Sequence, residues 1–364
     1  MGAGDDYRHA SDEEEALIVS KTREELRAND SRRFWIVVSL LLLVSVLGLG
    51  LLYSRAGGGI ITRQEEFPLN FLVIGDWGRN GFYNQSLVAS QMGRVGELLD
   101  IDFVISVGDN FYNTGLTGVK DPKFTTSFSR IYTAPSLQKP WYTILGNHDY
   151  MGDALAQLDP AMTQRDSRWY CRREFELRRS LCGSLNTGAC ESSVDLFFID
   201  TTPFIDEYWM PNATQTFDWR GLAPRQEQLR SQVERLDRLL ASSRATWKIV
   251  VGHHTMHSFG RHGDSVELLD QILPVLEAHD VDAYINGHDH CLEHIKHSDS
   301  KITFITSGAG SKSWQGIRPA TVANGLHFAY DGQGFVSASV GRSSFLLEFY
   351  DAFGNVLHTT HLRK

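Results

Sequence analysis

The sequence lacks an excess of positive charge. Its 35 lysine and arginine residues are outnumbered by 44 aspartate and glutamate residues, which gives a formal net charge of −9. No basic stripe with interleaved aromatic residues is present, so a nucleic-acid-binding protein is not expected. The chain also contains no internal repeat, and a stacked-repeat architecture is therefore not expected either.

Cysteine is scarce, with four residues in a chain of 364. An even number permits two disulfide bonds. Cys182 and Cys190 enclose a short glycine-containing loop and are the easiest pair to join, which would leave Cys171 to pair with Cys291. Four reduced cysteines are the alternative, which is less expected if the domain lies in an oxidising compartment.

One segment, residues 34–52, lacks charge altogether and is long enough to cross a bilayer as a helix. Trp35 and Tyr53 stand at its two ends, as interfacial aromatic residues do. A cleaved signal peptide is the competing interpretation, but a largely polar stretch of more than 30 residues precedes the apolar run. Lysine and arginine are more frequent before the span than after it, which predicts a cytosolic N-terminus.

These features predict four regions. Residues 1–33 are expected to form a cytosolic disordered tail, residues 34–54 a transmembrane signal-anchor helix, residues 55–66 a linker and residues 67–364 a lumenal domain. The sequons at Asn84 and Asn212 fit a glycosylated lumenal domain. The tail contains EEEALI, similar to an acidic dileucine signal, although a plain amphipathic stretch is the alternative. The expected location is the lysosome, the vacuole, another secretory compartment or the cell exterior.

Five short apolar runs each reach a glycine that is followed directly by metal-binding residue types. They are FLVIGDWG, FVISVGDNFY, WYTILGNHD, KIVVGHH and AYINGHDH. Such runs are typical of strands covered on both faces, and the glycine places the next side chain at the carboxyl edge of the sheet, where α/β proteins build their sites. The strand ends together offer enough ligands for two metal ions: Asp76, Asp109, Tyr112, Asn147, His148, His253, His254, His288 and His290.

Helical and strand patterns alternate along the domain. Residues 84–100, 226–242 and 266–278 carry apolar residues at helical spacing, the last segment bent or started at Pro274. Residues 165–193 have no clear pattern and are expected to form an irregular surface excursion. Strand residues with glycine turns dominate beyond residue 300. The predicted fold class is α/β (α+β), with two mixed β-sheets packed as a sandwich and flanked by helices.

The candidate ligands divide by charge. Asp76, Tyr112 and His290 with a shared Asp109 supply two carboxylates and a phenolate, which suit a trivalent ion. Asn147, His253 and His288 with the same Asp109 supply mostly neutral ligands, which suit a divalent ion. The tyrosine is the most informative of these residues. Because its free pKa is about 10, only a strong Lewis acid such as Fe(III) holds it as phenolate in acid.

The series GDWG, GDNFY, GNHD, VVGHH and GHDH resembles, in order and spacing, the purple acid phosphatases among the calcineurin-like metallophosphoesterases. The resemblance runs from about Phe71 to about Phe349. The chain is similar to the small, tartrate-resistant acid phosphatase-like members, because no fibronectin-like domain precedes Phe71. The tyrosine in GDNFY separates this family from relatives that have a histidine near that position.

The resemblance implies a metallophosphoesterase fold, an Fe(III) ion, and a second divalent metal that is Fe, Zn or Mn. The implied metal ligands are Asp76, Asp109, Tyr112, Asn147, His253, His288 and His290. It also implies substrate-site roles for His148, in GNHD, and for His262, nine positions after His253. Many family members have proline where this chain has Thr255, which leaves the shape of the following loop open.

The implied activity is that of an acid phosphatase, a phosphoric monoester hydrolase, in which hydroxide held by the metals attacks phosphorus. His148 or His262, protonated below about pH 6.5, would give a proton to the leaving alkoxide. The expected substrates are small-molecule or protein phosphate monoesters, and a monomer is expected. A phosphodiesterase or nucleotide pyrophosphatase is one alternative, against which Tyr112 argues. An inactive membrane-tethered binding protein is the other, against which the complete ligand set argues.

Overall fold

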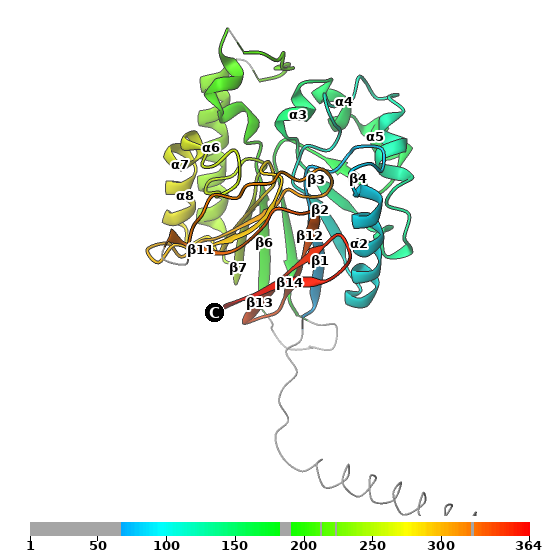
Figure 1. Ribbon diagram of the computed structural model, residues 1–364. Helices are drawn as coiled ribbons and strands as arrows, with labels where there is room; N and C mark the ends of the chain where they lie inside the picture. Colours follow the sequence, from blue (N-terminus) through cyan, green and yellow to red (C-terminus); the bar gives the residue numbers. More distant parts are fainter. Residues whose placement is uncertain (1–66, 183–190, 212, 223, 322–323) are drawn as a thin grey trace, which may run out of the picture. The chain divides into compact units, whose positions relative to one another are not determined.

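Two seven-stranded β-sheets lie face to face in the computed structural model of the chain (Figure 1). It describes residues 67–182, 191–211, 213–222, 224–321 and 324–364. The first sheet has the strand order β14-β13-β12-β1-β2-β3-β4, and the second has the order β11-β9-β10-β8-β7-β6-β5. Each sheet contains both parallel and antiparallel pairs. The prediction of two mixed sheets with helices is thus confirmed.

The first sheet contains β1 (Leu69–Ile74), β2 (Phe103–Ser106), β3 (Trp141–Thr143), β4 (Trp169–Cys171), β12 (Gly334–Val340), β13 (Ser344–Asp351) and β14 (Val356–Arg363). The second contains β5 (Phe175–Ser180), β6 (Ser193–Phe198), β7 (Trp247–Val251), β8 (Ala283–Asn286), β9 (Leu292–Ile295), β10 (Thr303–Ser307) and β11 (Leu326–Tyr330). The helices are α2 (Gln85–Leu99), α3 (Asn147–Tyr150), α4 (Ala154–Leu158), α5 (Pro160–Arg165), α6 (Arg225–Ser242), α7 (Val266–Gln271) and α8 (Leu273–Ala278). Shorter helical turns are η1 (Thr125–Ser129), η2 (Pro135–Leu137), η3 (Thr202–Phe204) and η4 (Asp206–Trp209).

The hydrophobic core has three layers because both faces of the central strands are covered. In β1, Phe71 and Val73 pack between the two sheets, whereas Leu72 and Ile74 pack with residues of α2. Helices α6, α7 and α8 cover the outer face of the second sheet (Figure 1). Strands buried on both faces read as continuous apolar runs, which explains why β1, β2, β3, β7 and β8 were recognisable without alternation.

The helix predictions are confirmed, with small shifts at the ends. Residues 84–100 and 226–242 correspond to α2 and α6. The third predicted helix is divided into α7 and α8, with Pro274 in the first turn of α8. Proline has no N–H to donate to the preceding turn, so the helix is interrupted there and a new one begins.

Two predictions were wrong. Residues 165–193 are not wholly irregular, because they include β4 and β5 at the edges of the two sheets. Cys171 and Cys291 are buried free thiols rather than a disulfide pair. Cys182 is disulfide-bonded, whereas Cys190 lies outside the described residues.

Several predictions concern residues that the structure does not describe. The predicted tail, span and linker lie among residues 1–66, and Asn212 is also outside the described ranges. Among the helices of the described part, none is both long and apolar enough to cross a bilayer.

Candidate metal centre

The predicted ligands lie where strands end and the backbone turns sharply. Asp76, Asp109 and His288 each follow a glycine and have φ values of 61°, 51° and 67°. Non-glycine residues in this left-handed region are uncommon, and they cluster at functional sites. A Cβ atom on Gly146 would lie 2.2 Å from Asp109 Oδ1, so a larger residue there would displace the carboxylate. The short glycine exits therefore allow the strand ends to approach closely.

Four of these side chains converge on one point. The Tyr112 hydroxyl lies 2.9 Å from Asp76 Oδ1, 2.8 Å from Asp109 Oδ2 and 3.0 Å from His290 Nε2. His290 Nε2 lies 3.5 Å from Asp76 Oδ1. Ligands that are about 2.0–2.2 Å from one ion lie roughly 3 Å from each other, so this spacing fits a single metal ion.

Asn147, His253 and His288 form a second group beside the first. Asn147 Oδ1 is 3.1 Å from His253 Nε2 and 3.1 Å from His288 Nδ1. Asp109 Oδ1 lies 3.4 Å from His253 Nε2, whereas Oδ2 of the same carboxylate faces Tyr112. Asp109 thus belongs to both groups, and the structure brings together all seven predicted ligands.

The histidines are oriented by their second ring nitrogen. His253 Nδ1 is 2.8 Å from the Val107 carbonyl oxygen, and His290 Nδ1 is 2.6 Å from that of Lys312. A carbonyl can only accept, so each Nδ1 donates and each Nε2 presents its lone pair to the centre, as in many metal sites. The indole of Trp314 stacks on His290 with ring centroids 4.0 Å apart and restrains it further.

The side chain of His254 does not make the contacts that His253 makes with Asn147 and Asp109. Its two ring nitrogens lie 2.9 Å from Thr201 Oγ1 and 3.1 Å from Tyr208 Oη. Both nitrogens are therefore engaged by hydroxyl groups. This geometry agrees with a structural role for His254 and leaves His253 as the donor of this strand end.

Burial makes the centre a poor environment for uncompensated charge. Burial and the neighbouring Asp109 raise the pKa of Asp76 well above its usual value. Burial and the two carboxylates likewise raise the pKa of Tyr112. Burial lowers the pKa of His290 to about 3 and lowers that of His288 well below its usual value. A histidine binds a metal ion in its neutral form, which the lowered pKa values favour. The positive charge of bound metal ions would also offset the charge of the buried carboxylates. The donors therefore fit a pair of metal ions.

A pocket of about 400 Å³ opens over these donors. Its lining includes Asp109, Asn147, His288 and His290 as well as both predicted substrate-site histidines, His148 and His262. His148 Nε2 is 3.9 Å from Asp109 Oδ2, and the His262 ring stacks on His288 at 4.1 Å. His257 is not part of this lining and instead packs on His297 and Phe304.

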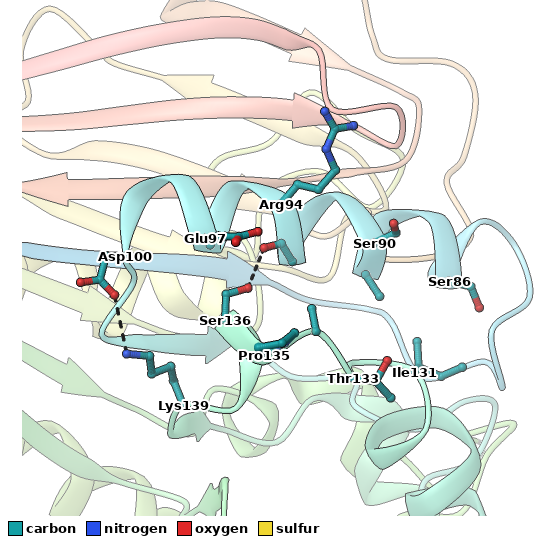
Figure 2. A pocket seen from close by; sticks show the side chains of 14 residues that line it. Ser86, Ser90, Arg94, Glu97, Asp100, Ile131, Thr133, Pro135, Ser136 and Lys139 are labelled. Carbon is teal, nitrogen blue, oxygen red and sulfur yellow. Dashed lines mark hydrogen bonds and ion pairs between the residues drawn. The ribbon is translucent and has the colours of Figure 1, made fainter.

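A larger hollow, of about 600 Å³, lies along α2 (Figure 2). Residues 131–139 form its other side, and Lys139 pairs with Asp100 across one end at 3.9 Å. None of the predicted ligands lines this hollow. The chemistry predicted from the strand ends therefore belongs to the smaller pocket.

Two buried aspartates within the motifs support the centre, and sequence reasoning missed both. Asp149 accepts backbone N–H groups of Asn110, Phe111 and Gly146, which ties the GDNFY and GNHD loops together. Burial, followed by the charge of Asp109, raises the pKa of Asp149 to about 7. The sequence feature that could have indicated this role is the position of Asp149 directly after Asn147 and His148 in GNHD.

The other aspartate, Asp289, stands between the two histidines of GHDH. It accepts the backbone N–H of His262 at 2.8 Å and the hydroxyl of Ser258 at 2.5 Å. The same loop is closed by Thr255, whose hydroxyl donates to the Gly263 carbonyl at 2.6 Å. These bonds fix the loop that carries His262 over the pocket, although Thr255 replaces the proline common in the resembled family.

Comparisons with known proteins agree with this geometry. A family model described as calcineurin-like phosphoesterase matches residues 69–292. Purple acid phosphatase 3 of Arabidopsis thaliana is 53% identical over 300 residues, which cover 81% of this chain and 78% of the relative. The chain belongs to the purple acid phosphatases. It is accordingly an acid phosphatase, and the family implies a dinuclear metal centre.

The chain is also similar to a more distant acid phosphatase and to solved structures. Tartrate-resistant acid phosphatase type 5 of Homo sapiens is 30% identical over 307 residues, covering 81% of this chain and 90% of the relative. One similar solved structure is that of GAP50, described as the anchor in the inner membrane complex of Plasmodium. Its TM-score is 0.68 and its sequence identity is 25%, and the match covers 81% of this chain and 88% of that chain. A purple acid phosphatase from yellow lupin shares the fold, with a TM-score of 0.56 and 17% identity over 81% of this chain and 53% of that chain.

Proposed function

We propose that this acid phosphatase holds Fe(III) and a divalent ion, Fe, Zn or Mn, in the two groups described above. The Fe(III) ligands would be Asp76, Asp109, Tyr112 and His290, and the divalent ligands would be Asp109, Asn147, His253 and His288. The observation that carries the proposal is the position of the Tyr112 hydroxyl, within 3.0 Å of donor atoms from three other ligands. A phenolate in a set with two carboxylates favours a trivalent ion over a divalent one.

When bound, the two metals supply Lewis acidity toward the phosphoryl group and a nucleophile derived from water. The chain's own contribution to the leaving group comes from His148 and His262. His148 Nδ1 lies 2.5 Å from the Asn113 carbonyl oxygen and therefore donates to it. Its Nε2 then carries a proton only in the imidazolium form. His148 would thus act as a general acid toward a phosphate monoester in the pocket.

The rival functions make different demands on this site. GAP50 is described as an anchor, which makes a membrane-tethered binding protein a fair alternative for this fold. The convergence of seven donor side chains favours an enzyme, since a binding role gives no reason for buried carboxylates at this spacing. A phosphodiesterase would use the same metals, and comparing the turnover of a monoester with that of its diester distinguishes the two.

The visible spectrum tests the metal assignment. The purified protein is expected to contain about one iron and one further metal per chain and to absorb in the visible range through ferric–phenolate charge transfer. Tyr112→Phe removes the only phenol oxygen of the set and is expected to abolish the band while Asp76, Asp109 and His290 still retain iron. A colourless wild type with two zinc or manganese ions would keep the phosphatase and refute the Fe(III) assignment.

We also propose that the domain lies in a lumenal compartment, tethered by residues 34–54. The support is the charge pattern around that segment, the exposed position of Asn84 and the disulfide at Cys182. In sealed microsomes, residues 67–364 are expected to resist added protease until detergent is present, and Asn84→Gln is expected to increase electrophoretic mobility by the mass of one glycan. Digestion of the domain without detergent would refute this orientation.

A further inference from the structure

Arg79 lies against the ring of Tyr112 and has no role in the chemistry derived so far. It follows GDWG directly, and its guanidinium carbon is 3.6 Å from the centroid of the Tyr112 ring. It is the closest cation–aromatic contact among the described residues. A guanidinium at this distance is attracted by the negative face of the ring.

The other contacts of Arg79 hold it in place without neutralising it. Its Nη1 donates to Asn113 Oδ1 at 2.8 Å, and its backbone N–H donates to Gln85 Oε1 at 3.0 Å. Its Nε is buried and has no hydrogen-bond partner. Among the described carboxylates, none forms an ion pair with Arg79. The guanidinium therefore keeps its charge, and its nearest aromatic ring is that of Tyr112 at 3.6 Å, with Tyr83 farther away at 5.6 Å.

This ring belongs to the ligand that the two-metal assignment gives to Fe(III). Tyr112 is only 5% exposed and Arg79 is half-buried, so water screens the interaction only in part. The guanidinium charge also reaches Asp76, whose pKa it lowers in opposition to the larger effects of burial and of Asp109. Arg79 is thus a fixed cation on the outer side of the proposed ferric ligand set.

We propose that Arg79 is a positioning residue that sets the donor strength of the Tyr112 phenolate and, through it, the reduction potential of the iron. The inference rests on the proposed Fe(III) assignment. A cation beside the phenolate stabilises its donor electrons, which raises the energy of the transition from phenolate to iron. The same charge favours the metal state of lower positive charge, so it raises the reduction potential.

The test compares two substitutions of Arg79 in the purified, metal-loaded full chain. Arg79→Met keeps an apolar stem and removes the charge, and it is expected to move the visible band to longer wavelength by on the order of 10 nm, the size that corresponds to a cation–π contact. It is also expected to lower the reduction potential measured by spectroelectrochemical titration. Arg79→Lys keeps the charge and is expected to stay closer to wild type in both measurements.

Two controls separate this role from simple packing. Asn113→Ala removes the hydrogen-bond acceptor of Arg79 and leaves the charge, so its band is expected to remain within a few nanometres of wild type. Arg94→Met removes an exposed arginine of α2 that lines the separate hollow (Figure 2), and no shift is expected. An unshifted band in Arg79→Met, or an equal shift in Asn113→Ala, would overturn the inference. A wild type without the band would instead overturn the Fe(III) assignment on which it rests.

Discussion

Asp109→Ala is expected to lower kcat for a phosphate monoester by at least about a thousandfold. Losing a residue that merely orients a ligand typically costs about 10–100-fold in metal affinity or activity, and Asp109 contacts both donor groups directly. Its Oδ2 lies 2.8 Å from Tyr112 Oη, and its Oδ1 lies 3.4 Å from His253 Nε2. Without this carboxylate each metal loses a ligand, and the negative charge that both share disappears. Steady-state kinetics and metal content per chain measure the two effects together.

The loss is expected to concern chemistry rather than folding. Burial raises the pKa of Asp76, and the repulsion from the adjacent buried Asp109 raises it further. Removing the Asp109 carboxylate relieves this repulsion, so the metal-free variant is expected to be no less stable than the metal-free wild type.

Asp195→Ala provides the matched control for Asp109→Ala. Asp195 is a buried aspartate in β6 that pairs with Arg178 at 2.7 Å and is not part of the pocket lining. Its replacement is expected to reduce stability and to leave kcat and metal content unchanged. A full complement of two metals with wild-type kcat in Asp109→Ala would refute its place in both groups.

Much of the site could be predicted from the sequence because its ligands lie at strand ends. Apolar runs that stop at glycine identified β1, β2, β3, β7 and β8, and parallel strands bring their carboxyl ends to one edge. Nine candidate donors could therefore be expected at one place from the sequence, and the division by charge and the family resemblance selected seven of them as ligands. The charges of the side chains also predicted which donors share a metal ion, such as Tyr112 with Asp76 and Asp109.

The remaining features depend on contacts that no local pattern records. Asp149 and Asp289 accept backbone N–H groups of other loops. Their places inside GNHD and GHDH mark them, but no local pattern identifies the groups that they bind. Arg79 reaches Tyr112 only through the fold of the turn that follows β1. Strand β5 was not predicted because it lies at the edge of its sheet and its sequence, FELRRS, contains three charged residues. Charged residues are typical of edge strands. The free thiols of Cys171 and Cys291 could not be deduced from spacing alone.

Loading the metal-free protein with Fe(III) is expected to release protons, and the affinity is therefore expected to fall as the pH falls. In the metal-free state, burial and the adjacent carboxylates raise the pKa of Tyr112, and burial and Asp109 raise that of Asp76. Both groups must lose a proton to become ligands. Lower pH stabilises the protonated, metal-free state, so the apparent affinity drops by about tenfold per pH unit for each proton released. Calorimetry in two buffers of different ionisation enthalpy counts these protons.

Tyr112→Phe is the control, since this variant is expected to release one proton fewer on binding Fe(III). Its apparent affinity should therefore fall less steeply with pH, by about a factor of ten less for each pH unit. The change should affect only the metal bound by the first group. An unchanged proton count in this variant would mean that the tyrosine is not deprotonated on binding, which would contradict phenolate ligation.

The divalent ion is expected to respond differently to pH. Burial lowers the pKa of His253, and it lowers that of His288 well below its usual value. Because both pKa values lie below the ordinary value of about 6.5, these imidazoles are mostly neutral above that pH in the metal-free protein, so an incoming ion displaces few protons from them there. Asp109 adds none either: burial opposes ionisation, but His253 and His148 lower the pKa of this carboxyl below its usual value. Between about pH 6.5 and 7.5, the affinity for zinc is therefore expected to change much less than tenfold per unit. Zinc and iron affinities that fall in parallel with pH would show that the two ions do not occupy the two donor groups as assigned.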